Sequence, residues 1–357
     1  MMLDRQRNWL IDIIKAFLIV FVVLGHAIEF GSGDAYFQSG AYFDNVVFKT
    51  IYSFHMPLFM LTSGYLFSSS VIRRSLKDNL LKKVTTLIVP IVVWTIVPMV
   101  YVIQNEFIPS QEPVTVLWIA RRVFSNIIHN LWFLWAVFYC SAIVLLVNRY
   151  CKDSLWVYLG IFCMSFFLPD RFYIGAYSFM YPFFVAGYLF QKHDLTEKLN
   201  SLSLSVSLSL SSIRRLYLLV LGCTFVVMLS FYDRDIYIYT SGYSLLKGAI
   251  LSQLYIDLFR CLIGFVGCAV VILALSELEP YLRPLRPVLL LLGKHTMGIY
   301  VISEYLHPLL LSVTQELSGL SYPIALMETI IIVIVSLFFI WVIQRSSLLN
   351  RLLLGAR

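Results

Sequence analysis

Four ionisable side chains lie inside the first apolar run of the chain: Asp12, Lys15, His26 and Glu29. Lys15 and His26 are eleven residues apart, about three turns of an α-helix, so they share nearly one face roughly 16 Å apart along the axis. Asp12 and Glu29 extend the same stripe. A polar stripe on a helix in lipid must face protein or a water-filled cavity. A histidine in such a place can move protons, and a lysine can bind an anion.

The second apolar run, FHMPLFMLTSGYLF, supplies a helix that would face this stripe. Because it returns across the membrane, His55 enters at a depth comparable with His26, while Ser63 lies toward the Lys15 end. Pro57 removes a backbone donor, so the sequence predicts that this helix is kinked or broken around a cavity. Two histidines and a basic mouth would then share that cavity.

Each polar residue also has a simpler explanation. His55 can hydrogen-bond to a neighbouring helix, Lys15 can extend to the interface, and Asp12 can pair with a nearby basic residue. His26 is harder to explain in this way, because it lies deep in the run and shares a stripe with Lys15. The basic residues that follow the second run are typical of a topology signal: Arg73, Arg74, Lys77, Lys82 and Lys83.

The composition excludes an ordinary soluble domain, since 60% of the residues are hydrophobic and only 13% are charged. A bilayer core needs about 20 apolar residues of helix. The sequence therefore predicts an all-α integral membrane protein, a bundle of about ten transmembrane helices that takes up the whole chain, 1–357. The predicted spans are 9–30, 46–68, 84–104, 130–148, 154–169, 173–191, 214–232, 255–277, 287–313 and 323–344.

Basic residues are about threefold more frequent in the loops on one side of this topology, which predicts that both termini are cytoplasmic. This distribution also accounts for the net charge of +7 without a nucleic-acid partner. The first span is too long and too polar for a signal peptide. The six cysteines lack CxxC spacing and fall mostly in spans, so we interpret them as packing residues and expect no metal. The Ser/Leu run at 200–212 is interpreted as a linker or surface segment.

Several motifs then resemble one family. LIDIIKAFLIVFVVLGHA, YSFHMPLFMLTSGYLF, HNLWFLWAVFY and LGKHTMGIYVISEYL, followed by the basic LLNRLLLGAR, resemble the acyltransferase-3 family in content and order from about residue 5 to 355. Members of that family are membrane-integral enzymes that acylate carbohydrates at or across the bacterial inner membrane. The most specific mark is a basic residue and a histidine separated by ten others, which Lys15 and His26 match.

The resemblance implies an acyl donor, usually acetyl-CoA, on the cytoplasmic side, and a hydroxyl of a cell-surface or lipid-linked glycan as acceptor. His26 would be the essential catalytic residue, acting as general base or as a transient acyl carrier. Asp12 or Glu29 would orient neighbouring groups, and His55 would stabilise the oxyanion, as Ser63 or Tyr65 could. The donor would be held by Lys15, Ser63, Tyr65, Arg73, Arg74, Lys82 and Lys83, with Asp12 beside them. The distance from Lys15 to His26 is comparable to an extended pantetheine arm.

The chain also departs from the family. Many members carry His or Gln three residues after the GIY tyrosine, where this chain has Ser303 followed by Glu304, an intramembrane carboxylate that we expect to face the cavity as a catalytic group. No residues remain for a fused esterase-like domain, so this chain completes the transfer or passes the acyl group to a glycan-assembly partner.

Two other classes of function stay open. One is a secondary transporter that uses the same stripe as a proton or anion pathway, a hypothesis that Arg260 and Lys294 in other spans also fit, although no internal repeat is visible. The other is a membrane anchor for an assembly complex.

Overall fold

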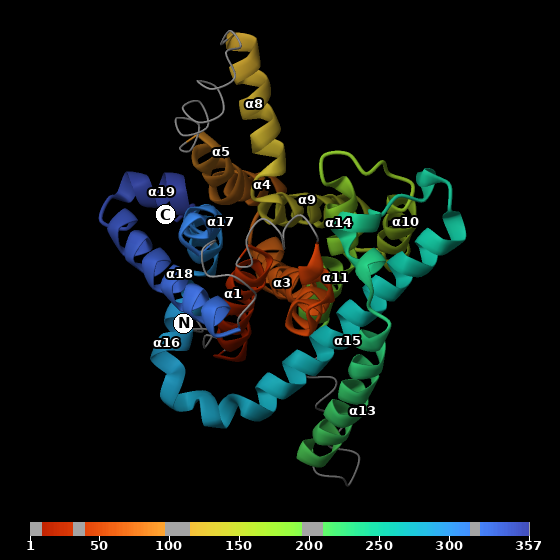
Figure 1. Ribbon diagram of the computed structural model, residues 1–357. Coiled ribbons are helices and arrows are strands. Elements are labelled where there is room, and N and C mark those ends of the chain that lie inside the picture. Colours follow the sequence, from red (N-terminus) through yellow and green to blue (C-terminus); the bar gives the residue numbers. More distant parts are fainter. Residues whose placement is uncertain (1–8, 31–39, 97–114, 195–209, 315–321, 357) are drawn as a thin grey trace, which may run out of the picture.

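The computed structural model describes residues 9–30, 40–96, 115–194, 210–314 and 322–356, and within these ranges the chain is helical and contains no strand (Figure 1). The long helices are α1 (Trp9–Phe30), α3 (Val46–Arg73), α9 (Trp132–Cys151), α11 (Ile174–Lys192), α13 (Leu210–Ser230), α15 (Ile250–Leu282), α17 (Thr296–Thr314) and α18 (Tyr322–Ile343). The shorter ones are α4 (Leu76–Lys83), α5 (Val89–Ile96), α8 (Val116–His129), α10 (Leu155–Ser165), α14 (Ile238–Ser241), α16 (Arg286–Lys294) and α19 (Ser347–Leu354). One-turn helices are η1 (Ala41–Asp44), η4 (Arg234–Ile236), η5 (Leu245–Lys247) and η6 (Arg283–Leu285), and the π-helical segment η2 (Val84–Ile88) joins α4 to α5.

Helices occupy every predicted span as far as the structure describes it; residues 97–104 of the third predicted span lie outside the described ranges. Six helical stretches in the described residues are long and apolar enough to cross a membrane, which confirms a multi-pass membrane protein. They are Trp9–Phe30, Leu76–Ile96, Trp132–Cys151, Ser212–Ser230, Ile250–Lys294 and Tyr322–Ile343. The count of ten crossings and the cytoplasmic position of both termini stay predictions. The Ser/Leu run lies almost entirely outside the described residues.

The centre of the molecule is α1, which packs against α3, α15, α16, α17 and α18 (Figure 1). Helix α3 in turn packs along α11 at very close range. A Cβ atom on Gly64 of α3 would lie 2.0 Å from the Phe184 carbonyl oxygen, and one on Gly187 of α11 would lie 1.9 Å from the Leu61 carbonyl oxygen. Small residues at these two points let the helix backbones touch, as is common between helices in membranes.

Helix α3 begins at an N-cap and continues through its proline. Asn45 caps it, since its side-chain oxygen accepts hydrogen bonds from the backbone N–H groups of Val47 at 3.0 Å and Phe48 at 3.1 Å. The helix then runs without interruption past Pro57 to Arg73. The sequence predicted a kink or a break at Pro57, and the structure has no break there, because the packing of α3 against α1, α11 and α15 holds the helix together across the missing N–H.

The outer helices present large apolar side chains on their exposed faces. On α13 these are Leu216, Leu219, Val220, Val226 and Val227, and on α18 they are Ile330, Ile334, Phe338 and Trp341. In water such surfaces would drive aggregation, whereas in a bilayer they contact acyl chains at no cost. The histidine and carboxylate side chains of the candidate site, in contrast, face the interior of the bundle around α1.

Candidate active site

His26 lies between two carboxylates that come from different helices. Its Nδ1 is 3.1 Å from Glu29 Oε2, one turn further along α1, and its Nε2 is 3.3 Å from Glu304 Oε1 of α17. The three side chains are 22%, 22% and 29% exposed, so a small molecule can reach them. The sequence predicted His26 and Glu304 as catalytic residues, and the structure brings the two together.

Tyr52 of α3 fixes the orientation of this cluster. Its hydroxyl donates to Glu29 Oε2 at 3.0 Å, and its ring meets the His26 ring edge-on with centroids 6.5 Å apart. A neutral imidazole carries one N–H, so it can donate to only one carboxylate at a time. Since Tyr52 already anchors Glu29, the arrangement favours an Nδ1–H donated to Glu29. Nε2 then lies on the Glu304 side of the ring.

A second histidine–carboxylate pair lies directly behind the first. His307 of α17 and Glu328 of α18 are 1% and 3% exposed, with Nδ1 and Oε1 3.0 Å apart. The His307 ring is 5.7 Å from the His26 ring and stacks on Phe30. The sequence predictions missed this pair, although each residue is an ionisable group in an apolar span and His307 follows Glu304 by three residues on the same helix face.

A cavity of about 160 Å³ leads from Lys15 toward His26. On α1 it is lined from Lys15 to Val22, one turn short of His26, and on α17 it reaches Tyr300, one turn short of Glu304. Of the predicted stripe, Lys15 lines this cavity, whereas Asp12, His26 and Glu29 do not. The remaining walls of the cavity are mostly apolar and include Ile19, Met56, Phe59, Thr62, Ser63, Phe133, Leu134, Thr296 and Met297.

A second cavity, of about 260 Å³, adjoins the first at the Lys15 end. The two share Ser63, Leu66 and Val137, and the second is lined by the basic residues Lys82 and Lys83. His295 lies close enough to both Lys15 and Lys294 for their charges to act on its ring. Ser63, Lys82 and Lys83, predicted from the sequence as donor-binding residues, thus lie along one path with Lys15. The prediction did not include Lys294 or His295 in the site, although the LGKHTMGIY motif contains both.

The other predicted site residues lie outside this path. Arg73 and Arg74 are exposed and donate to Ser69 O at 2.9 Å and Ser70 Oγ at 3.0 Å on their own helix. Tyr65 is partly buried and lines neither cavity.

Asp12 is 5% exposed where Gly293 of α16 packs on its backbone. His55 Nδ1 lies 2.8 Å from the Ile51 carbonyl oxygen in the same helix, and the His55 ring contacts Tyr52 at 4.8 Å.

The guanidinium of Arg260, which the transporter hypothesis would use, is engaged in hydrogen bonds within the protein. It donates to Asp257 at 2.8 Å, to the Ile236 carbonyl at 2.6 Å and to the Gly242 carbonyl at 3.0 Å. It therefore fastens the segment before α15 to that helix. Among the described residues, no group of three His, Cys, Asp or Glu side chains is arranged to hold a metal ion.

These features define a polytopic membrane protein with a histidine–carboxylate centre inside its bundle and a basic-mouthed cavity that leads to it. The chain belongs to the acyltransferase-3 family, whose model, described as an acyltransferase domain, matches residues 8–345. It is therefore a membrane-spanning member of an acyltransferase family.

Two curated relatives carry the name Nodulation protein NolL. The one from Mesorhizobium japonicum is 27% identical over 187 residues, which are 52% of this chain and 48% of that protein. The one from Sinorhizobium fredii is 28% identical over 240 residues, which are 66% of this chain and 61% of that protein. The matched part of this chain thus spans less than two thirds of either relative. No solved structure matches the chain significantly.

Proposed function

We propose that this protein is an O-acyltransferase of the bacterial inner membrane that moves an acetyl group from cytoplasmic acetyl-CoA to a hydroxyl of a cell-surface or lipid-linked glycan. The observation that carries the proposal is the pair of adjoining cavities that extend from Lys82 and Lys83, past Lys15, to within one turn of His26 and Glu304. The basic end suits nucleotide phosphates, and the narrow apolar stretch suits a pantetheine arm. The thioester would then arrive at the histidine.

In the proposed reaction His26 acts as general base. Glu29 holds the Nδ1–H, and Nε2 takes the proton from the acceptor hydroxyl as its oxygen attacks the thioester carbonyl carbon. The new C–O bond forms, the C–S bond breaks, and the proton passes from Nε2 to the sulfur, giving the ester and free CoA. Glu304, 3.3 Å from Nε2, would stabilise the positive charge that develops on the imidazole as it takes this proton.

A transient acyl-histidine is the competing mechanism, since an Nε2 lone pair can attack the thioester directly. The two mechanisms differ in whether acetyl-CoA alone labels the protein. Purified protein would be mixed with radiolabelled acetyl-CoA without acceptor and quenched. A base mechanism leaves the protein unlabelled, whereas an acyl-histidine leaves label that His26→Ala removes.

The secondary transporter remains the alternative function, and one experiment separates it from the enzyme. Native protein in lipid is given acetyl-CoA with and without a crude glycan extract, and release of free CoA thiol is measured beside His26→Ala and Lys15→Ala. We expect glycan-dependent release, its abolition by His26→Ala, and partial rescue of Lys15→Ala by more donor. Absence of release with every acceptor, together with donor-independent solute uptake into vesicles, would instead establish a transporter.

A further inference from the structure

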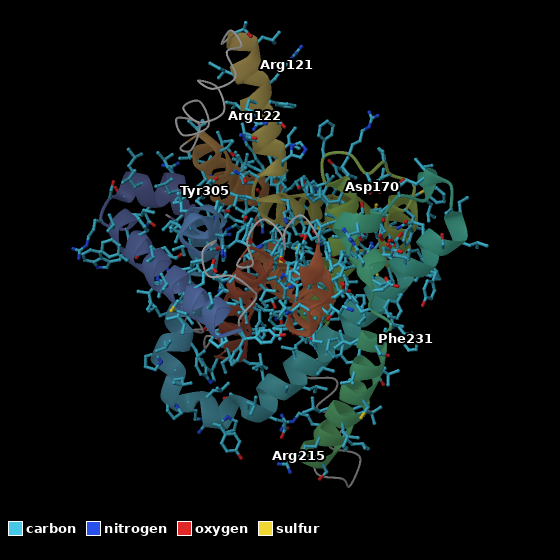
Figure 2. All side chains as sticks on the ribbon, in the orientation of Figure 1. Arg121, Arg122, Asp170, Arg215, Phe231 and Tyr305 are labelled. Carbon is cyan, nitrogen blue, oxygen red and sulfur yellow. The ribbon has the colours of Figure 1, made fainter. Side chains whose placement is uncertain are left out.

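A third cavity, of about 430 Å³, lies beyond the His26 end of the bundle. It is formed by the loop before α11 and the segment from α14 to α15, with His129 of α8 at its edge. Figure 2 shows Asp170, one of its lining residues, beside α10 and α14, on the opposite side of the molecule from α19. The volume falls within the range of about 300–1,000 Å³ that ligand pockets occupy. None of the groups proposed to hold acetyl-CoA lines it.

The aromatic wall of this cavity is held in an unusual backbone conformation. Phe172 and Tyr173 are consecutive residues with φ of 54° and 59°, in the left-handed region that bulky side chains rarely adopt. Leu131, with φ of 51°, sets the position of Trp132 in the same way. The Trp132 and Tyr173 rings stack, with centroids 6.5 Å apart and planes 13° apart. Such strain persists only where the surrounding structure enforces it, and it gathers at ligand sites.

Asp170 joins the two halves of the rim. Its carboxylate accepts hydrogen bonds from the backbone N–H groups of Tyr243 at 2.9 Å and Ser244 at 3.0 Å, and pairs with Lys247 at 2.8 Å. Two glycines make room for it: a Cβ atom on Gly175 or on Gly242 would lie 2.0 Å or 2.2 Å from its oxygens. The rim is therefore fixed in advance, as a binding site requires.

Aromatic side chains connect this cavity with the catalytic centre. Tyr52, which bonds to Glu29 and meets His26 edge-on, shares a narrow cleft with Trp132 and Tyr239. Tyr239 contributes to both that cleft and the large cavity. A molecule seated in the large cavity thus lies across one aromatic layer from His26, on the side opposite the Lys15 path.

We propose that this cavity binds one neutral pyranose ring of the acceptor, with Tyr173 and Tyr239 against its C–H face and His129, Thr240 and Lys247 at its hydroxyls. A sugar ring has an apolar face edged by hydroxyls, and this wall offers rings edged by polar groups. Because Asp170 balances Lys247, the cavity suits an uncharged ring better than a phosphate. The proposal rests on the proposed function, since it names where the acceptor of that reaction is held.

The first test separates acceptor binding from donor binding in turnover. Native protein, Tyr173→Ala and Tyr239→Ala would be assayed for CoA release against rising amounts of neutral oligosaccharide from the envelope of the source organism. We expect each variant to raise the half-saturating oligosaccharide concentration about tenfold while the KM for acetyl-CoA stays unchanged. Phe231→Ala, an exposed ring directly after the outer α13 (Figure 2), is the matched control and should change neither. Unchanged half-saturation in both tyrosine variants would overturn the proposal.

The second test measures binding without turnover, by saturation-transfer NMR of the same oligosaccharide fraction. We expect signals with native protein and His26→Ala, and their loss with Tyr173→Ala. Equal signals with all three proteins, or none with native protein, would refute the cavity as the sugar site. If native protein releases no CoA yet the NMR pattern is as expected, the proposed reaction fails and the sugar site stands.

Discussion

At the scale of single residues, the proposed reaction depends on which ring nitrogen of His26 is left unprotonated. Glu29 is anchored by Tyr52 at 3.0 Å and so is the better orienting carboxylate. We expect Glu29→Gln to lower kcat about 10²–10⁴-fold, because the amide can present its own N–H to Nδ1 and stabilise the wrong tautomer. Tyr52→Phe, which removes only the anchoring hydroxyl, should cost less than about tenfold. Steady-state CoA release measures both, and equal losses in the two variants would contradict the distinction.

Asp170 supplies a prediction of pH dependence outside the membrane spans. Burial alone would raise the pKa of its carboxyl, but the Lys247 ammonium and the N–H groups of Tyr243 and Ser244 hold that pKa below its usual 3.8. A depressed pKa means that the carboxylate stabilises the fold above about pH 4 and that this contribution is lost as pH falls through the folded-state value.

We therefore expect the melting temperature of native protein in detergent to fall between pH 5 and pH 3 more steeply than that of Asp170→Asn. The variant should start lower at pH 7, because Lys247 then lacks its partner. Parallel curves for the two proteins would show that the loop contact contributes no pH-dependent stability.

At the scale of elements, the contact between α3 and α11 positions the site. Gly64→Ala or Gly187→Ala would place a methyl group about 2 Å from a backbone oxygen of the partner helix, so the helices must separate. We expect a loss of at least about 1–3 kcal/mol of stability, and lower activity because Tyr52 and Ser63 lie on α3. Gly160→Ala on α10 and Gly222→Ala on α13 are matched controls with open space around the new methyl, and should be neutral or slightly stabilising.

Elements also show how far the sequence predicts the structure. The Lys15–His26 stripe could be predicted because both residues belong to one helix, whose geometry is fixed by its repeat. Glu304 was predicted as a site residue because it is an intramembrane carboxylate, and the same rule would have identified His307 and Glu328. Its pairing with His26 was not predicted.

The acceptor cavity had no comparable signal in the sequence. It depends on Asp170 meeting the Tyr243–Lys247 segment more than seventy residues later, and tertiary packing alone decides that contact. Of the kink or break expected at Pro57, the break is absent for the same reason, since neighbouring helices stabilise α3 across the proline.

At the scale of the whole molecule, the membrane orientation is the open prediction. With both termini cytoplasmic, Cys151 at the end of α9 faces the cytoplasm and Asp235 in η4 faces outward, both exposed. In intact cells, an impermeant maleimide should label a protein whose single cysteine is Asp235→Cys. A protein whose single cysteine is Cys151 should be labelled only after the cells are opened. The reverse pattern would invert the topology and place the basic mouth on the outer side.

The apolar stretch between Lys15 and His26 has an electrical consequence. A membrane protein with cavities open to both sides could let ions leak and so dissipate the ion gradients that the membrane maintains. Here the cavity between Lys15 and His26 is lined by apolar side chains, among them Ile19, Val22, Phe133 and Leu134. Apolar side chains cannot replace the water molecules that hydrate an ion, so an ion is not expected to pass. We expect the reconstituted protein to carry no measurable current across a planar bilayer. The proposed acetyl transfer would then take place without a leak of ions.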